Sequence, residues 1–458
     1  MTDALFNEDL IRRYDTSGPR YTSYPTAVQF HEGFGEAEYR AAAQATNAGG
    51  APLSLYVHIP FCDTVCFYCA CNKVVTKDRS RASAYLDRVE RELALQGELF
   101  DGQRPVDQMH WGGGTPTFLS HGEMERLIEA TARHFRLRDD DTGEYALEID
   151  PREVGNDTLH LLRQLGFNRL SIGIQDLDPD VQKAVNRVQP DRDTFGALDT
   201  ARGEGFRSVS VDLMYGLPFQ NRQRFARTLD RIIEAGPDRI AVFNYAHMPH
   251  YFKPQRRIRD EDLPSPQEKL AILHETIDRL TGAGYVYIGM DHFARPDDEL
   301  ARAQANGTLH RNFQGYSTHA TCDLVAIGAT GIGQVGNTYS QNVRELDDYY
   351  AALDAGRLPI FRGLELTFDD RLRRAVITDL ICHFQLDTAR VSAQWGIDFD
   401  DYFAAERAAL EPMVADGLVE REGTILRVRE PGKLLIRNIC MVFDAYLERA
   451  EGRHSKVI

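Results

Sequence analysis

The sequence predicts an α/β fold, an incomplete (β/α)6 barrel with an N-terminal arm and a small, mainly helical, winged-helix-like C-terminal domain. From about residue 51, apolar strand-like runs alternate with amphipathic helix-like stretches, a pattern typical of right-handed βαβ units and a parallel sheet. From about residue 365 the chain changes to helices followed by a hairpin pattern. We therefore expect three consecutive parts: an arm over residues 1–50, a partial barrel with an extension over 51–364, and a C-terminal helical domain with a β-hairpin over 365–458.

The arm is expected to hold one short helix. Residues Glu8–Tyr14 fit a helix, which Ser17-Gly18-Pro19 ends because glycine and proline break helices. The next segment, Arg20–Ala27, carries an arginine and two tyrosines without a clear period.

The partial barrel is expected to contain six strands with helices between them. The strands are Leu53–His58, Val106–Trp111, Glu144–Ile149, Arg169–Ile174, Ser208–Met214 and Ile240–Tyr245, and the clearest helices are Arg81–Leu95, Gly122–Phe135 and Thr158–Leu165. In barrels of this kind the loops that follow the strands carry the chemistry. The motifs described below all lie in such loops or at strand ends.

Beyond the six units, a strand is expected at Tyr285–Met290, followed by a loop rich in polar and aromatic residues from Asp291 to Thr318. The C-terminal domain is expected to contain two helices and a hairpin around Glu422-Gly423-Thr424. The helices are Asp369–Cys382 and Phe399–Asp416, and the hairpin strands are Leu418–Arg421 and Ile425–Val428.

Composition and charge narrow the class of protein. The chain is 43% hydrophobic and carries a formal charge of -16, so it offers no basic excess for nucleic acid or an anionic membrane surface. We find no basic leader with an apolar core and no apolar run long enough to span a bilayer. Cys322, Cys382 and Cys440 are scattered singly and fit buried packing positions rather than a disulfide framework. We therefore expect a cytoplasmic protein.

The cysteine motif is the strongest chemical signal. Cys62, Cys66 and Cys69 follow the first strand with the spacing C-x3-C-x2-C, which supplies three thiolates from one loop. Iron–sulfur clusters are normally held by four cysteines, so three leave one iron open to another ligand. A zinc site is the alternative, but no second pair of ligands lies nearby. Cys71 is a fourth ligand, a packing residue or a thiol beside the cluster.

Two further groups of residues follow later strands. The segment His110–Thr117 contains three consecutive glycines, which allow close backbone approach to a ligand. Glu148, Gln175-Asp176 and Asp212 place polar groups in or at the end of buried strands, where they need a salt bridge or a polar ligand. We interpret three such positions at one end of a sheet as a ligand site.

Two weaker signals remain open. Arg187 fits either a bidentate grip on a carboxylate or a solvated helix position. His247 and His250, three residues apart, fit loop chemistry or packing, with a metal site as the alternative.

Together these motifs resemble the radical S-adenosylmethionine superfamily and, more narrowly, the oxygen-independent coproporphyrinogen III oxidase family. The first resemblance rests on the cysteine motif, the triple glycine and the six βα units. The second rests on segments spread over nearly the whole chain. They are Arg20–Ala27, Cys71-Asn72-Lys73, Asn244–His247, Gly289–Phe293 and His310–Tyr316.

The resemblance implies an oxidoreductase of porphyrin and haem biosynthesis. It implies a 4Fe–4S cluster on three cysteines, with the open iron bound by S-adenosylmethionine, and a second S-adenosylmethionine molecule. A 5′-deoxyadenosyl radical then initiates oxidative decarboxylation of two propionates of coproporphyrinogen III, which gives the vinyl groups of protoporphyrinogen IX without oxygen. The protein's part is orientation, electrostatics and exclusion of water.

The resemblance also implies roles for particular residues. Cys62, Cys66 and Cys69 correspond to the cluster ligands and catalytic residues of the family. Positions around the cluster-bound S-adenosylmethionine correspond to Tyr56, Gly113, Glu148 and Ile332. Positions around the second molecule correspond to Tyr68, Gly114, Thr115, Gln175, Arg187, Asp212 and Ala246.

The substrate's four carboxylates require local cations in an acidic protein. By residue type and location we expect Arg20 and Arg311 to bind them, with Tyr21, Tyr24 and Gln314 closing over the macrocycle.

The alternative function within the same family is a haem-binding chaperone. That branch lacks the cysteine corresponding to Cys71 and the arm resembling Arg20–Ala27, and this chain has both. A zinc-stabilised scaffold is a third possibility. For the oxidase we expect a monomer that acts on a small molecule, with no nucleic acid and no membrane span, and that uses an electron donor and a final electron acceptor left open by the sequence.

Overall fold

The computed structural model describes residues 5–447, which form two units. The larger unit contains residues 30–264 and 321–365, and the smaller contains the described residues before 30, between 265 and 320, and from 366 onward. This division differs from the three consecutive parts expected from the sequence. The start of the chain and the segment 265–320 make their contacts with the C-terminal part, which linear order does not reveal.

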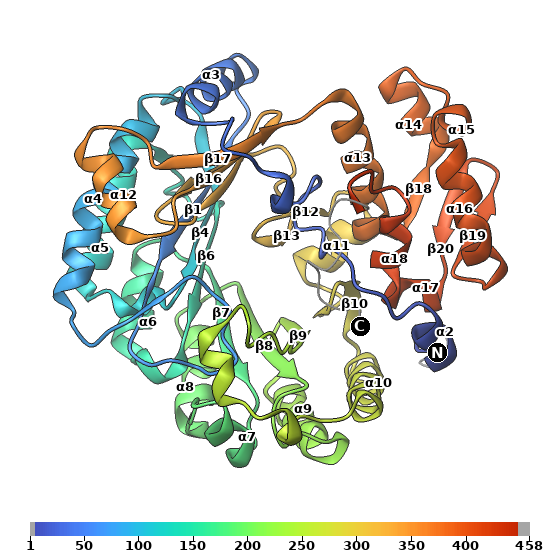
Figure 1. Cartoon of the computed structure of the whole chain (residues 1–458). Coiled ribbons are helices and arrows are strands. Elements are labelled where there is room, and N and C mark those ends of the chain that lie inside the picture. Colours follow the sequence, from blue (N-terminus) through green and yellow to red (C-terminus); the bar gives the residue numbers. More distant parts are fainter. Residues whose placement is uncertain (1–4, 448–458) are drawn as a thin grey trace. The chain divides into compact units, whose positions relative to one another are not determined.

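A parallel sheet forms the centre of the larger unit (Figure 1). Its strands lie in the order β9 (Arg239–Asn244), β8 (Ser208–Tyr215), β7 (Arg169–Gln175), β6 (Glu144–Ile149), β4 (Pro105–Gly113) and β1 (Leu53–Ile59). Every neighbouring pair is parallel. The six predicted strands are confirmed, and their carboxyl ends lie at one edge.

The register of the sheet aligns its core residues. Val57 lies opposite Trp111, and Trp111 lies opposite Leu147. All three side chains are fully buried. Burial of such side chains stabilises the fold by about 1.5–3 kcal/mol each, so a one-residue slip of any of these strands is strongly disfavoured.

Four strands extend the sheet beyond β1. β14 (Asp323–Ile327) pairs with β1 in parallel, and the next strands continue in antiparallel order. They are β15 (Ile332–Val335), β16 (Thr338–Asn342) and β17 (Ile360–Glu365). These four strands were not predicted from the sequence, whereas the strand expected at Tyr285–Met290 is confirmed as β10 (Val286–Gly289).

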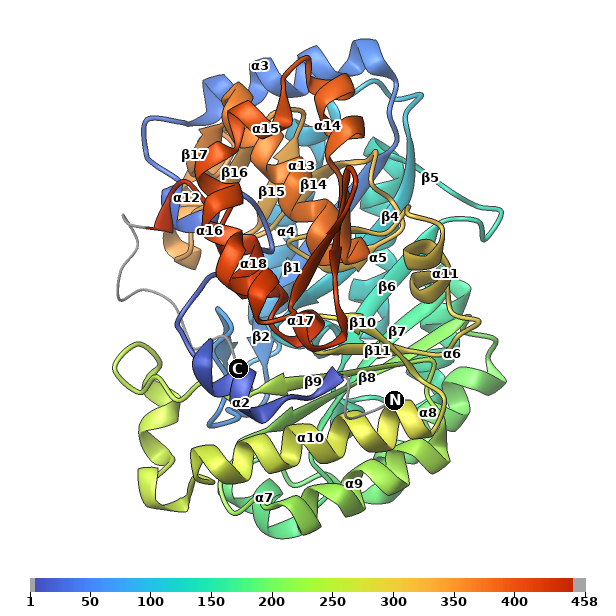
Figure 2. The same ribbon diagram turned by 90° about the vertical axis from the view of Figure 1, so that its right-hand side faces the viewer.

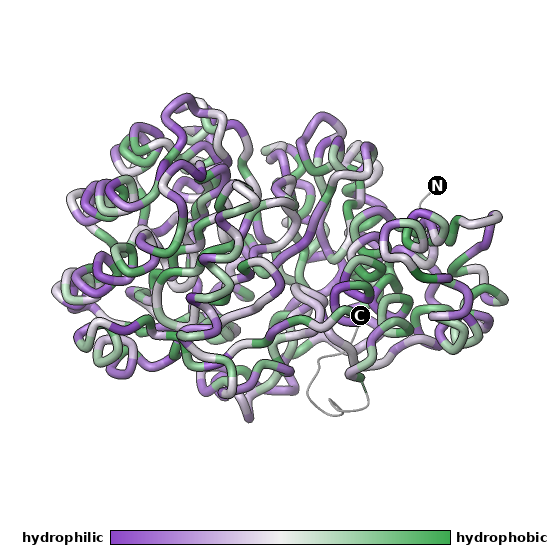
Figure 3. Tube along the Cα trace, turned by 90° about the horizontal axis from the view of Figure 1, so that it is seen from above, coloured by the Kyte–Doolittle hydropathy of each residue, from purple (hydrophilic) through white to green (hydrophobic). Residues whose placement is uncertain are grey.

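Helices flank the strands of the larger unit (Figure 1). They are α3 (Glu36–Thr46), α4 (Ser80–Gly97), α5 (His121–His134), α6 (Asn156–Gln164), α7 (Pro179–Ala184), α8 (Asp191–Gly203), α9 (Arg222–Ala235) and α12 (Leu346–Asp354). The predicted helices are confirmed as α4, α5 and α6, with ends shifted by one or two residues. In Figure 3, hydrophilic and hydrophobic segments alternate along such helices, as amphipathic packing requires. The helix α3 was missed, because the first 50 residues were interpreted as an arm.

Caps fix where some of these helices begin. The Ser120 hydroxyl accepts a hydrogen bond from the Glu123 backbone, and the Glu123 carboxylate accepts one from the Ser120 backbone. This capping box satisfies two amides that a helix start otherwise leaves unpaired.

The smaller unit contains short helices and hairpins. Figure 2 shows its C-terminal helices grouped together. Its elements are α2 (Glu8–Arg13), α10 (Pro266–Gly282), β10 (Val286–Gly289), β11 (His292–Ala294), α11 (Glu299–Ala305), β12 (His310–Asn312), β13 (Gly315–Ser317), α13 (Phe368–His383), β18 (Gln385–Asp387), α14 (Thr388–Trp395), α15 (Phe399–Tyr402), α16 (Ala404–Ala415), β19 (Val419–Glu422), β20 (Ile425–Val428), α17 (Glu430–Leu434) and α18 (Ile436–Met441).

Two expectations for this unit were wrong. The segment from Asp291 to Thr318 is not a loop, since it holds two short hairpin strands, a helix and the strand β11. The expected helix Phe399–Asp416 is divided at Phe403, whose ring is fully buried between Phe399 and Phe443. The predicted hairpin is confirmed as β19–β20, and β18 adds a third strand to it.

The arm segment around Arg20 is anchored on α18 and the residues after it. The buried Arg437 guanidinium donates hydrogen bonds to the carbonyls of Gly18 and Pro19. Tyr21 Oη donates to Asp444 over 2.9 Å, and Tyr24 Oη accepts from the Ala445 amide over 3.0 Å. Both tyrosines belong to the buried core of this unit. The described part of the arm before residue 30 is therefore a packed part of the smaller unit, whereas residues 30–50 belong to the larger unit.

Candidate functional site

A cavity of about 160 Å³ lies in the larger unit, where β4, β6, β7 and β8 end. It brings together the cysteine loop, the glycine loop and the polar strand ends. The sequence-predicted residues that line it are Cys62, Cys66, Tyr68, Cys69, Gly113, Gly114, Thr115, Glu148, Gln175, Arg187 and Asp212.

Three other residues expected at the cofactor are not among those that line this cavity. Tyr56 lies on β1, and its ring stacks on His110 with 6.0 Å between centroids. Ile332 is the first residue of β15, and Ala246 lies two residues beyond β9. Their cofactor roles stay predictions.

The cysteines of the loop are free thiols in different surroundings. Thr115 Oγ1 donates a hydrogen bond to Cys62 Sγ over 3.6 Å, and burial raises the pKa of Cys62 to about 12. A hydrogen bond from Cys71 and the positive charge of Lys73 lower the pKa of Cys69 to about 5. Cys71 is exposed and lines the cavity. The loop thus presents its sulfurs to one space.

The glycine loop is tied to the strand that leads into the cysteines. The amide of Gly114 donates to Ile59 O over 2.7 Å, and the amide of Thr115 donates to Phe61 O over 2.8 Å. A Cβ on Gly114 would lie 2.6 Å from Phe61 O. Gly113 has a φ of +115°, and its Cβ would lie 2.5 Å from the His58 ring. Only glycine fits at both positions.

Two arginines and one aspartate form a buried ionic group beside Cys66. Arg187 Nη1 lies 2.9 Å from Asp150 Oδ2, and Arg152 binds the same carboxylate through Nε and Nη2 at 2.9 and 2.6 Å. Burial opposes ionisation of Asp150, but the two guanidiniums leave its pKa below the usual value. Arg187 Nη2 also donates to Gly173 O over 2.5 Å. Arg187 is therefore a buried, fixed residue rather than a solvated one.

The carboxylates at the strand ends differ in protonation. Burial opposes ionisation of Glu148, yet the contact between its Oε1 and His110 Nε2 at 3.4 Å helps to lower its pKa. Asp212 accepts a hydrogen bond from Ser171 Oγ over 2.9 Å, and burial raises its pKa to about 7. At neutral pH Glu148 is therefore ionised, whereas Asp212 is close to its midpoint.

Sequence reasoning missed His58 as part of the site. Its Nδ1 accepts from Tyr56 Oη and its Nε2 donates to Asn72 O, both over 3.1 Å. Burial lowers the pKa of His58 to about 4, so the ring is neutral and each nitrogen has one role. The ring thereby connects the end of β1 to the segment that carries Cys71 and Lys73. In the sequence, the only sign that His58 belongs to the site is its place within an apolar strand.

His247 does not support the metal alternative raised by the sequence. Its Nδ1 lies 2.8 Å from Tyr245 Oη, and its Nε2 lies 3.0 Å from Asp260. Both ring nitrogens are therefore engaged. In the described part of the chain, no three histidine, cysteine or acidic side chains lie close enough to hold a single metal ion.

The residues expected at the substrate lie in the smaller unit. Arg311 is at the centre of β12, and its guanidinium stacks over the Tyr316 ring at 4.7 Å. Among the described residues, its Nε and Nη1 and Gln314 Nε2 are buried without a hydrogen-bond partner. Burial raises the pKa of Asp291, and Arg20, Arg437 and Arg311 oppose that rise. The positive charges of these three arginines therefore act on one carboxyl group.

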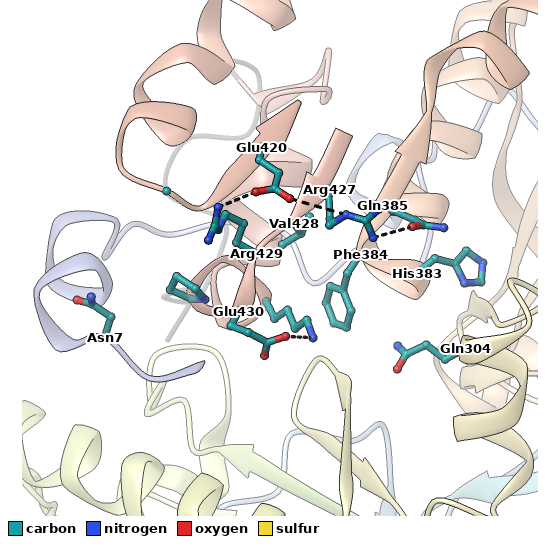
Figure 4. A pocket seen from close by; sticks show the side chains of 13 residues that line it. Asn7, Gln304, His383, Phe384, Gln385, Glu420, Arg427, Val428, Arg429 and Glu430 are labelled. Atoms are coloured by element: carbon teal, nitrogen blue, oxygen red, sulfur yellow. Dashed lines mark hydrogen bonds and ion pairs between the residues drawn. The ribbon is translucent and has the colours of Figure 1, made fainter. Parts of the chain in front are cut away.

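A second cavity, of about 800 Å³, lies in the smaller unit beside the hairpin (Figure 4). Its cations already have anionic partners. Arg429 Nη1 lies 2.6 Å from Glu420, and Lys433 Nζ lies 2.6 Å from Glu430. We assign no role to this cavity.

Comparison with known proteins identifies the family. The description "Radical SAM superfamily" matches residues 56–232, and "HemN C-terminal domain" matches residues 366–435. The oxygen-independent coproporphyrinogen III oxidase of Pseudomonas aeruginosa is 54% identical over 460 residues, with full coverage of both chains. The chain belongs to the oxygen-independent coproporphyrinogen III oxidase family. The enzyme of that name from Escherichia coli strain K12 is 51% identical, covering 96% of this chain and 95% of its own.

A solved structure supports the same family. It is described as coproporphyrinogen III oxidase from Escherichia coli, a radical SAM enzyme, and it matches with a TM-score of 0.93 and 49% identity. The match covers 97% of this chain and 100% of the other. The expected radical SAM fold is therefore confirmed. No helix within residues 5–447 is both long and apolar enough to cross a membrane.

The groups that line the cavity suit the two cofactors that the family uses, a 4Fe–4S cluster and S-adenosylmethionine. Three thiols reach it from one loop, and a four-iron cluster does not need them to converge on a single point. Arg187 Nε and Glu153 Oε2 are buried without partners among the described residues. The cofactor offers an amine, a carboxylate and ribose hydroxyls to such groups. Gly113 and Gly114 have no side chains, so a cofactor can approach their backbone closely.

Proposed function

We propose that this protein converts two propionate side chains of coproporphyrinogen III to vinyl groups, giving protoporphyrinogen IX without oxygen. The observation that carries the proposal is the meeting of Cys62, Cys66 and Cys69 with the glycine loop and Arg187 in one cavity. It occurs in a chain that matches named oxidases over its full length.

Cys62, Cys66 and Cys69 hold the cluster in this proposal, and Cys71 is not a ligand. When bound, the cluster and S-adenosylmethionine supply the radical chemistry that removes hydrogen from the propionate. The protein binds and orients them. Thr115 directs its hydroxyl to Cys62, and the ionised Glu148 offers an acceptor to an amine. The other cofactor contacts proposed are Tyr56, Tyr68, Gly113, Gly114, Gln175, Arg187, Asp212, Ala246 and Ile332.

Arg20 and Arg311 bind substrate carboxylates in this proposal. The support is the pair of unpartnered, buried N–H groups on Arg311 and the excess of arginine over aspartate around Asp291. An unpaired buried donor is costly, and a carboxylate that accepts from a guanidinium removes that cost. Tyr21 and Tyr24 are buried in the core of the smaller unit, which does not fit the expectation that they close over the macrocycle. They hold the arm on its base, so their proposed role is to position Arg20. Gln314 supplies an amide donor beside Arg311.

The proposal includes partners that complete the electron balance. Each decarboxylation releases carbon dioxide and passes one electron from the substrate to a final acceptor, and a separate donor reduces the cluster. We propose that the protein acts as a cytoplasmic monomer. Sedimentation of the holoprotein tests the oligomeric state.

An anaerobic turnover assay tests the activity. Reconstituted, reduced protein receives S-adenosylmethionine and coproporphyrinogen III, and vinyl products and 5′-deoxyadenosine are measured. We expect both products from the wild type and neither from Cys62→Ser. Absence of both from wild-type protein with an intact cluster contradicts the oxidase and favours the haem-binding alternative, which haem titration then checks.

A further inference from the structure

Cys66 differs from the other cysteines of the loop because two guanidiniums contact its sulfur. Arg187 Nη1 lies 3.6 Å and Arg152 Nη2 lies 3.8 Å from Cys66 Sγ. Both arginines also bind Asp150, which fixes them in place. Cys62, by contrast, accepts a hydrogen bond from the neutral hydroxyl of Thr115. Cys66 is therefore the one of the three with two guanidinium contacts, whereas Cys69 is influenced by the single ammonium of Lys73.

Arg152 belongs to no motif that the sequence revealed. It lies on the short turn Pro151–Glu153 after β6, and its side chain is 17% exposed. It also lines the cavity. Its forked contact with Asp150 orients the guanidinium so that Nη2 faces Cys66.

We propose that Arg152 raises the reduction potential of the cluster by placing a positive charge and an N–H donor on the Cys66 sulfur. The proposal rests on the assignment of Cys66 as a cluster ligand. An external one-electron reductant supplies the electron that takes the cluster from the 2+ to the 1+ state, and no bond in the protein forms or breaks. Hydrogen bonds to cluster sulfurs and the local charge set such potentials.

The direction of the effect follows from the charge that reduction adds. The added electron makes the cluster and its sulfurs more negative, so a nearby cation stabilises the reduced state more than the oxidised state. Little solvent screens this interaction, because the Arg152 and Asp150 side chains are only 17% and 7% exposed. Arg187 acts in the same direction, but its bond to Gly173 O also holds the wall of the cavity. Arg152 is therefore the better residue to change.

Removing Arg152 leaves its surroundings supported. Asp150 keeps its contact with Arg187 at 2.9 Å. Arg152→Gln deletes the charge and preserves a polar side chain of medium length. Arg152→Lys preserves the charge but loses the contact that two guanidinium nitrogens make with Asp150. Arg163→Gln is the matched control, because Arg163 pairs with Asp141 at 2.8 Å in the same unit without contacting a cysteine.

The test is an anaerobic redox titration of the reconstituted holoproteins, with dithionite as reductant and the EPR signal of the reduced cluster as readout. For Arg152→Gln we expect about a tenfold lower ratio of reduced to oxidised cluster at a fixed potential, equivalent to about 59 mV for one electron. The ratio of reduced to oxidised cluster should change less in Arg152→Lys, and in Arg163→Gln it should match that of the wild type. A wild-type potential in Arg152→Gln with full cluster content overturns the proposal.

The iron content of the variants distinguishes an effect of Arg152 on the reduction potential from an effect on cluster assembly. If Arg152→Gln loses its cluster, Arg152→Lys decides: restored iron content with a near-wild-type potential supports the proposal, and an equal loss in both variants overturns it in favour of a structural role. Cys66→Ser examines the underlying assignment separately. Full cluster content in that variant shows that the ligand assignment, rather than the tuning idea, has failed.

Discussion

Arg187 Nη1 and Asp150 Oδ2 lie 2.9 Å apart at the cavity wall, and the two residues are 37 positions apart in the chain. Both side chains are less than one-tenth exposed. A buried charge needs a partner, because its removal from water costs several kcal/mol. This pair therefore joins the end of β6 to the loop after α7 and holds Arg187 against Cys66.

Arg187→Ala should lower turnover at least tenfold while the cluster remains. The variant loses the proposed contact with S-adenosylmethionine and the bond to Gly173, and it leaves Asp150 with Arg152 alone. Turnover and iron content are measured on the same preparation. Arg163→Ala should retain wild-type activity, since its ion pair lies away from the cysteines. Unchanged turnover in Arg187→Ala rules out the proposed cofactor role.

Gly114→Ala should destabilise the protein by about 1–3 kcal/mol. The added methyl group would lie 2.6 Å from Phe61 O, so the glycine loop must move away from the cysteine strand. Gly122→Ala is the matched control, because a Cβ there meets nothing within 4 Å. Urea unfolding of the two variants gives the comparison. Equal stability of both would show that the close approach at Gly114 has no energetic consequence.

Glu92 should make the larger unit less stable as pH rises. Burial raises the pKa of Glu92 to about 7, above the ordinary value of 4.5. Between these values the folded protein keeps a proton that the unfolded chain releases, so stability falls with rising pH, by roughly 3 kcal/mol in total. Its contribution is full below about pH 4.5 and is lost as pH rises through 7. Glu92 accepts from Tyr349 and Asn342, which limits the shift.

Urea unfolding at pH 5 and pH 8 measures this effect. The wild type should lose more stability between the two pH values than Glu92→Gln. Glu125→Gln, which changes an exposed glutamate on α5, should behave like the wild type. The same pH dependence in Glu92→Gln and in the wild type would assign the effect to other groups.

Arg437→Gln should loosen the arm and raise the KM for coproporphyrinogen III more than it lowers kcat. The substitution weakens the bonds to Gly18 and Pro19, and hydrogen bonds from a charged donor contribute about 1.5–3 kcal/mol each. Protease cleavage between residues 12 and 24 should become faster. Arg427→Gln is the control, because Arg427 is exposed and pairs with Glu422. Wild-type KM and protease resistance in Arg437→Gln would show that the arm needs no such anchor.

The sheet and most of the candidate site were predictable for one physical reason. Parallel strands with buried apolar residues have a strong sequence pattern, and their carboxyl ends must meet at one edge. Gly113, Glu148, Gln175 and Asp212 lie within or at the ends of different strands, and Cys62 follows β1. The shared direction of the strands is enough to bring these residues together.

Other features depend on contacts that no local pattern encodes. Arg152 matters because Asp150 directs it toward Cys66, and the sequence showed only an arginine in a turn. His58 is neutral because the folded sheet buries it. The segment around Arg20 packs on Arg437, more than 400 residues later, so its interpretation as a separate arm was incomplete. The break at Phe403 follows from ring packing rather than from a helix-breaking residue.

The most direct test of the central claim is whether S-adenosylmethionine changes the EPR spectrum of the reduced cluster equally in wild-type protein and in Cys71→Ala. The account predicts a 4Fe–4S cluster in both proteins and the same cofactor-dependent change, because Cys62, Cys66 and Cys69 leave one iron open. Loss of the cluster in Cys71→Ala, or a wild-type spectrum that S-adenosylmethionine does not alter, would contradict it.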